Sequence, residues 1–263
     1  MIELKQVGKT YPGRDRHWGD RYFRRYRSWM PQESGPGIEV VVLVPQDLLP
    51  QERHDGPVHA LSDVSLHVEA GEFVAVRGPS GCGKSTLLTL VGGLGRPSSG
   101  QIRVAGEDLA ALSSAALTRF RARHIGFVFQ MFHLLPYLTV LENVMAAALP
   151  GRANEARQRA QELLERFQLT HRLRHRPAEL STGECQRVAV ARAMINGPSL
   201  ILADEPTGNL DPENAEAVLR LLAGFHGEGG TVLLVTHQEF AARYAQRTIL
   251  LREGRLVPDP GAA

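Results

Sequence analysis

A glycine-rich run at residues 78–86, Gly-Pro-Ser-Gly-Cys-Gly-Lys-Ser-Thr, constrains this chain more than any other feature. It matches the pattern G-x-x-x-x-G-K-[ST] and lies between an apolar run and a helical pattern. Glycines permit a tight turn whose backbone N–H groups bind phosphate oxygens, and the helix that follows presents its positive end to the same anion. The sequence therefore predicts a nucleoside triphosphate site. The motif alone does not distinguish a kinase from a GTPase or a motor protein.

The residues of this phosphate loop have separate expected roles. Lys84 is expected to reach the β- and γ-phosphates as a compact point charge. Ser85 is expected to place its hydroxyl on Mg²⁺. The residues expected to contact the nucleotide are Gly78, Pro79, Ser80, Gly81, Cys82, Gly83, Lys84, Ser85 and Thr86.

Apolar runs and helical patterns alternate along the chain. The apolar runs are typical of strands buried on both faces of a mostly parallel sheet. They lie at 73–78, 125–129, 200–204 and 231–237, with helical patterns at 154–169 and 216–225 and a hairpin pattern around Glu253–Gly254. This order predicts an α/β core. The mainly helical residues 131–180 interrupt the alternation and are interpreted as a helical lobe inserted into that core.

Two carboxylates and a histidine follow predicted strands. Asp204 is expected to hold Mg²⁺ or its water shell, and Glu205 to act as general base on the attacking water. The alternative for the carboxylates is an acidic helix cap before Pro206. His237 ends the run at 231–237 and is expected to contact the γ-phosphate, the alternative being a purely structural histidine.

The run Leu-Ser-Thr-Gly-Glu-Cys-Gln-Arg-Val-Ala-Val-Ala-Arg-Ala at 180–193, upstream of Leu-Ile-Leu-Ala-Asp-Glu-Pro, resembles the signature of the ABC ATPase family. Ser181 and Glu184 also form an S-x-x-E capping box, which predicts a helix start. The resemblance implies an α/β fold: a phosphate-loop NTPase core with a small antiparallel β subdomain and an inserted helical subdomain. It covers 1–263 as one ATPase domain, except for an atypical insertion at 14–57.

The resemblance also assigns residues. Tyr11 resembles the aromatic residue that stacks on adenine. Gln130 is similar to the glutamine that joins the Mg²⁺ site to the helical lobe. The resemblance therefore assigns Gln130 to both the catalytic and the metal-binding residues. The signature, with Ser181, Gly183 and Glu184, is expected to complete the ATP site of the opposite subunit in a head-to-tail dimer. Asn209, Leu210 and Asp211 resemble the loop that couples the two ATP sites.

Three positions depart from the family pattern. Thr182 stands where the signature usually has its second glycine, and Cys185 replaces a usual glutamine or arginine. The insertion at 14–57 combines arginines with aromatic residues. It is either a solvated surface segment or a docking element for a partner or acidic lipid headgroups. A nucleic-acid patch is the least favoured interpretation.

The resemblance is greatest to the group that contains the LolD, MacB and FtsE ATPases. It implies an ATPase subunit, with ATP and Mg²⁺ as cofactors, that powers a separate membrane permease for lipoprotein, lipid, peptide or drug export or extraction. Two such subunits are expected to form a homodimer. The alternative is an FtsE-like regulatory module of a cell-division or cell-wall complex that transports nothing. A nucleic-acid motor is disfavoured because the chain carries one cassette.

Composition, the length of the apolar runs and the cysteine count indicate where the protein is expected to be located. Hydrophobic residues make up 43% and the net charge is +2, as expected for a soluble domain without a strong charge bias. No apolar run approaches the ~20 residues that cross a bilayer, and the first residues lack a signal peptide. Two cysteines, Cys82 and Cys185, fit a reducing compartment. We therefore expect a peripheral protein on the cytoplasmic face of the inner membrane, with no nucleic-acid partner.

Overall fold

The computed structural model describes residues 1–12, 56–150 and 153–257. The chain divides into two units, one formed by 1–9 with 60–263 and the other by 10–59. Residues 13–55, which contain nearly all of the predicted insertion at 14–57, lie outside the described residues.

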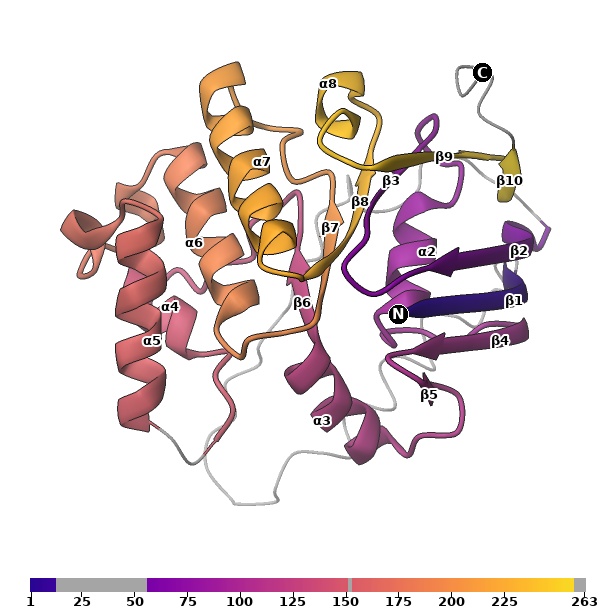
Figure 1. The fold of residues 1–263 in the computed structure, drawn as a ribbon, viewed down its shortest axis with the longest axis horizontal. Helices are drawn as coiled ribbons and strands as arrows, with labels where there is room; N and C mark the ends of the chain where they lie inside the picture. Colours follow the sequence, from indigo (N-terminus) through magenta and orange to yellow (C-terminus); the bar gives the residue numbers. More distant parts are fainter. Residues whose placement is uncertain (13–55, 151–152, 258–263) are drawn as a thin grey trace, which may run out of the picture. The chain divides into compact units, whose positions relative to one another are not determined.

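A six-stranded sheet forms the centre of the first unit (Figure 1). Its strand order is β10-β9-β3-β8-β7-β6, with parallel pairing throughout except for the antiparallel β9–β10 hairpin. The strands are β3 (Phe73–Arg77), β6 (Ile125–Val128), β7 (Leu200–Asp204), β8 (Thr231–Thr236), β9 (Arg247–Arg252) and β10 (Arg255–Val257). The predicted strands and the hairpin are confirmed.

Alternate residues of the central strands pack into two separate cores. Val74 and Val76 of β3 belong to one apolar cluster, whereas Phe73 belongs to the other. Leu200 and Ile201 of β7 divide in the same way. Side chains point to opposite faces along a strand, so a continuous apolar run buries both faces of the sheet.

Helices cover both faces of this sheet. Figure 1 shows α6 and α7 on one side and α2 on the other. The helices are α2 (Lys84–Val91), α3 (Ser114–His124), α4 (Val140–Met145), α5 (Ala153–Arg166), α6 (Thr182–Met194), α7 (Pro212–Gly227) and α8 (Glu239–Ala242), with 3₁₀ turns η2 (Thr170–Arg172) and η3 (Pro177–Glu179). The helical patterns at 154–169 and 216–225 correspond to α5 and α7.

A second, four-stranded sheet packs over α2, with strand order β2-β1-β4-β5. It consists of β1 (Ile2–Tyr11), β2 (Val58–Val68), β4 (Ser99–Val104) and β5 (Glu107–Asp108). β1 pairs antiparallel with β4, and β4 antiparallel with β5. Its buried side chains, including Ile2 and Ile102, share one core with Leu87 of α2. The predicted antiparallel β subdomain is therefore present.

The residues predicted as a helical lobe, 131–180, contain α4, α5, η2 and η3. Thr139 and Glu142 form a capping box that starts α4, and buried Asn143 donates to the carbonyls of Leu135 and Leu138. The boundaries of this lobe stay a prediction. Within the described ranges, no helix combines the length and apolarity needed to span a bilayer.

Candidate functional site

The phosphate loop connects β3 to α2, as the sequence predicts. Gly81 and Gly83 have φ angles of 77° and 107°, which residues with side chains rarely adopt. A Cβ on Gly83 would lie 2.3 Å from the carbonyl oxygen of Ala60. The backbone N–H of Leu87 donates to the carbonyl of Gly83 at 2.9 Å, so the helix begins directly after the loop. The N-terminal N–H groups of α2 therefore adjoin the loop, where they can bind an anion.

Lys84 is the first residue of α2, and the loop folds around its side chain. Only 8% of its surface is exposed. Its Nζ donates to the carbonyl oxygens of Gly78 and Pro79, each at 2.9 Å. An ammonium group has three protons, so these two bonds fix its position inside the loop and leave a third proton for a phosphate oxygen.

Asp204 ends β7 beside the phosphate loop. Burial raises the pKa of its carboxyl, as does the neighbouring charge of Glu205, while a hydrogen bond from Ser85 and the charge of Lys84 act in the opposite direction. Its Oδ1 is buried without a hydrogen-bond partner among the described residues. A hard cation prefers oxygen ligands, and a buried, unpaired carboxylate oxygen beside a serine hydroxyl fits Mg²⁺.

Glu205 and His237 meet at the ends of two neighbouring strands, β7 and β8. The N–H of Glu205 donates to the carbonyl of Val235 at 2.9 Å, with a φ of 45° at Glu205. The Glu205 carboxylate accepts from the backbone N–H of His237 at 3.3 Å and lies 2.9 Å from its Nδ1. A carboxylate only accepts hydrogen bonds, so Nδ1 carries the proton. His237 therefore orients Glu205, a contact that the sequence did not predict.

Gln130 follows β6 and lies beside the loop after β7. Its Nε2 donates to Oδ1 of Asn209 at 3.5 Å. A Cβ on Gly208 would lie 2.9 Å from the same Nε2. The structure thus brings Gln130 to the loop that contains Asn209, Leu210 and Asp211; its expected contact with the metal stays a prediction.

The signature segment begins α6, and the predicted capping box is present. Ser181 Oγ accepts from the N–H of Glu184, and the Glu184 carboxylate accepts from the N–H of Ser181 at 2.8 Å. Arg172 Nε donates to the same carboxylate at 2.8 Å. The Glu184 side chain is therefore directed into its own subunit, where it holds the helix start, and a role for this side chain in binding ATP stays a prediction. Thr182 is exposed at the first turn.

Both cysteines are buried. Cys82 is 6% exposed and Cys185 is 7% exposed. Burial, followed by the charge of Glu184, raises the pKa of the Cys185 thiol, and its Sγ lies 3.7 Å from the carbonyl oxygen of Pro177. The departure from the family pattern at Cys185 therefore places a small, unreactive side chain in the core.

Glu184→Gln is expected to lower the free energy of unfolding by about 1–2 kcal/mol at pH 7, as expected for a weakened cap and a lost ion pair. Burial opposes ionisation of Glu184, but the hydrogen bonds from Ser181 and Arg172 outweigh it and lower the pKa. The contribution is therefore present above the usual pKa of a glutamate and is lost as the pH falls through the lowered value. Urea unfolding at several pH values checks this. A difference that persists unchanged at pH 3 would contradict it.

The structure gathers most of the predicted catalytic residues at one edge of the six-stranded sheet. The phosphate loop follows β3, Asp204 is the last residue of β7, and His237 follows β8. These are adjacent parallel strands whose carboxyl ends meet at this edge. Tyr11 belongs to the other unit, so its stacking on adenine stays a prediction. Sequence reasoning missed Arg172, which donates to Glu184, and Asn214, which accepts from Arg187; neither lies in a motif.

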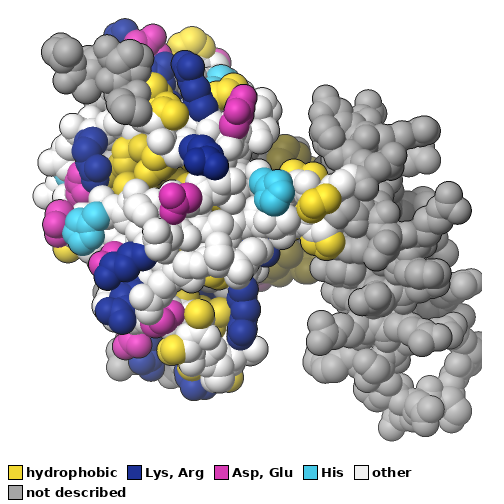
Figure 2. All heavy atoms as spheres, turned by 90° about the vertical axis from the view of Figure 1, so that its right-hand side faces the viewer, with side chains coloured by type: hydrophobic (Ala, Val, Ile, Leu, Met, Phe, Trp, Pro, Cys, Tyr) yellow, Lys and Arg dark blue, Asp and Glu magenta, His cyan; other side chains and the backbone are white. Residues whose placement is uncertain are grey.

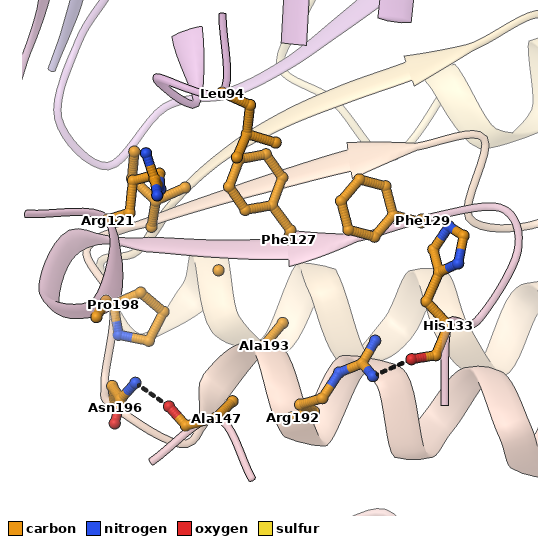
Figure 3. Close-up of a pocket in the computed structure, with 13 residues that line it drawn as sticks. Leu94, Arg121, Phe127, Phe129, His133, Ala147, Arg192, Ala193, Asn196 and Pro198 are labelled. Carbon is orange, nitrogen blue, oxygen red and sulfur yellow. Dashed lines mark hydrogen bonds between the residues drawn. The ribbon is translucent and has the colours of Figure 1, made fainter. Parts of the chain in front are cut away.

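A groove of about 420 Å³ lies along β6, on the side that pairs with no strand in this sheet. Figure 3 shows Leu94, Phe127 and Phe129 on one wall and Ala193 of α6 on the other. Arg192 lines its floor and donates to the carbonyls of Phe132 and His133. Gln130 directly follows Phe129, so the groove borders the loop that reaches Asn209.

Comparisons with known proteins identify the family of this chain. A family model described as ABC transporter matches residues 61–208. The chain is 49% identical over 207 residues to the macrolide export ATP-binding/permease protein MacB of Bradyrhizobium diazoefficiens, covering 78% of this chain and 32% of that protein. It is 47% identical over 204 residues to the uncharacterized ABC transporter ATP-binding protein YvrO of Bacillus subtilis, covering 77% and 89%. The chain thus spans about a third of the MacB protein that it matches.

A solved structure supports the same assignment. The dimeric ATP-binding cassette MJ0796, in a post-hydrolysis state with ADP and phosphate, superposes with a TM-score of 0.75 at 36% identity. The match covers 98% of this chain and 97% of that one. The predicted fold and the predicted ATPase class are both confirmed. The chain belongs to the ABC transporter family, as an ATP-binding cassette that hydrolyses ATP.

Proposed function

We propose that this cassette works as a head-to-tail homodimer that drives a membrane permease of the export or extraction type. The observation that carries the proposal is the meeting of Lys84, Asp204 and the Glu205–His237 pair at one sheet edge, in a chain that also has a capped signature helix. The chain contains both a phosphate-loop site and a signature helix, and the two belong to different elements of the fold. A second copy would bring its signature to this site.

The residues divide the work of hydrolysis. Lys84, held by two loop carbonyls, binds the β- and γ-phosphates. Glu205 is oriented by His237 and takes a proton from the attacking water. Because Nδ1 of His237 is used for Glu205, a hydrogen bond from its Nε2 to a phosphate oxygen requires the doubly protonated ring.

Ser85 and Asp204 are the residues proposed to hold Mg²⁺, and Gln130 is proposed as a further ligand on the family resemblance. When bound, the ion would neutralise phosphate charge. The unpaired Oδ1 of Asp204 supports this assignment, because a buried polar atom without a partner usually has a ligand.

The groove along β6 is the proposed docking site for the permease. It exposes apolar side chains, with Leu94 50% exposed. It is lined by residues of α6 and by Phe129, the residue before Gln130. A segment seated there would touch the signature helix and the Gln130 loop together. The MacB relatives combine ATP-binding and permease parts by name, which supports a permease as the occupant and an export function.

The face of the molecule drawn in Figure 2 does not have the charge pattern of a nucleic-acid site. On the face drawn in Figure 2, lysine and arginine side chains are interspersed with aspartate and glutamate. A nucleic-acid site needs a continuous basic stripe to follow phosphates. As the partner of a membrane permease, the protein is proposed to lie on the cytoplasmic face of the inner membrane as a peripheral subunit.

Leu94→Glu is expected to release the chain from membranes while leaving its nucleotide affinity unchanged. A carboxylate at the rim would have to be desolvated against Phe127 when the permease binds, which costs several kcal/mol. The measurement is the fraction of tagged chain retained by source-cell membranes, with identification of co-purifying multi-span proteins. A loss of about tenfold or more is expected.

Phe240→Glu is the matched control, because Phe240 is also an exposed apolar residue, at 40%. It lies on α8, which packs against β8 and β3 rather than β6. Equal membrane retention of Leu94→Glu and Phe240→Glu would contradict docking at this groove.

A further inference from the structure

The signature segment packs against the start of α7 with no space between them. An added Cβ at Gly183 would lie 2.0 Å from Oδ1 and 2.2 Å from Cγ of Asn214. Real side-chain carbons do not approach this closely, so either Gly183 or Asn214 would have to move. Asn214, a residue of the same chain, therefore leaves no room for a side chain at position 183, independently of any nucleotide.

The Asn214 side chain is held in one orientation. Its Oδ1 accepts from Nη1 of Arg187 at 3.0 Å, and its Nδ2 donates to Oδ2 of Asp211 at 2.6 Å. Its backbone N–H also donates to Oδ1 of Asp211 at 3.0 Å. Turning the amide over would place its NH₂ against a guanidinium and its oxygen against a carboxylate. These hydrogen bonds therefore fix the amide between α6 and the loop before α7.

Arg187 depends on this amide. Its Nε is buried and has no hydrogen-bond partner among the residues described. Arg187 as a whole is half-buried, and loss of the Asn214 oxygen would leave two of its polar groups, Nε and Nη1, without an acceptor in the protein, which is costly where they are shielded from water. The bond to Asn214 therefore holds Arg187, one helical turn after Gly183, in place.

We propose that Asn214 is a positioning residue for ATP-dependent dimer closure. It fixes the signature at Gly183 and Arg187 relative to Asp211, at the end of the loop proposed to couple the two ATP sites. Asn214 itself touches no reacting atom. The proposal rests on the proposed function, since the signature acts on the ATP of a second copy.

The test uses Glu205→Gln protein at saturating Mg·ATP and measures the dimer dissociation constant by light scattering. Asn214→Gly is expected to raise this constant about tenfold, which corresponds to about 1.4 kcal/mol. The nucleotide affinity of the monomer is expected to change less than twofold, because the phosphate loop lies between β3 and α2 and not at the start of α7. Glu213→Gly, at the adjacent exposed position, has the same backbone cost and should leave dimerisation near the parent value.

A double-mutant cycle separates positioning from mere stability. Gly183→Ala is expected to weaken the dimer about 100-fold. Adding Asn214→Gly removes the atoms that the new methyl group meets, so the double variant should dimerise better than Gly183→Ala alone. Two independent losses that simply add would overturn the proposal, because the glycine would then serve only the partner's nucleotide.

The two levels of inference fail differently. If Glu205→Gln does not dimerise with ATP at all, the proposed function is wrong. If it dimerises and Asn214→Gly matches Glu213→Gly, the proposed function stands and the role of Asn214 is overturned.

Discussion

Glu205→Gln is expected to reduce ATP turnover by about 10²–10⁴-fold, the usual effect of removing a general base. Glutamine has the size of glutamate, so the contact with the N–H of His237 can persist while the group that accepts a proton is lost. Lys84 and Asp204 are untouched, and nucleotide affinity should therefore stay within about twofold. The measurement pairs steady-state phosphate release with a nucleotide titration. A dimer that persists with ATP is the expected companion result.

Glu216→Gln is the matched control for this change. Glu216 is an exposed residue of α7 paired with Arg220, and its substitution should leave turnover unaltered. His237→Ala should also lower turnover, because the Glu205 carboxylate would lose the partner at 2.9 Å that orients it. Near-normal hydrolysis by Glu205→Gln would assign the base to another group and leave Glu205 a structural residue.

The fold was predictable where the local pattern and the tertiary structure impose the same requirement. Residues 200–204 are apolar throughout, and only a strand buried on both faces satisfies such a run. The phosphate loop was equally predictable, since Gly83 at a φ of 107° has few substitutes. The capping box of Ser181 and Glu184 was predictable because it depends on residues only three positions apart in the sequence.

Long-range partners were not predictable from the same patterns. Arg172 reaches Glu184 from a 3₁₀ turn, and Asn214 meets Gly183 from a different helix. No periodicity relates such positions, because the contact depends on how α6 and α7 pack. The role expected for Glu184 at the partner's ATP rested on the signature alone. The packed structure adds Arg172 to the predicted capping box as a second partner of its carboxylate.

Lys84→Ala is expected to weaken nucleotide binding itself, by about 10–100-fold, the range for a lost charge-assisted hydrogen bond. The side chain is nearly buried, and its Nζ is held by Gly78 and Pro79. Removing it takes away a positive charge and also leaves two loop carbonyls without their donor. The loop that presents N–H groups to phosphate should then lose its shape. Titration with a fluorescent ATP analogue measures the change.

Lys84→Met distinguishes the ammonium group from the packing of the side-chain stem, because it keeps an unbranched stem of similar length without the ammonium group. If the charge dominates, Lys84→Met should bind ATP as weakly as Lys84→Ala, and the affinity of both variants should depend less on salt than that of the parent. Lys5→Met is the control: Lys5 is exposed in β1 and pairs with Glu3. Parent-like affinity in Lys84→Met would show that backbone N–H groups and the α2 N-terminus bind the phosphates without the lysine.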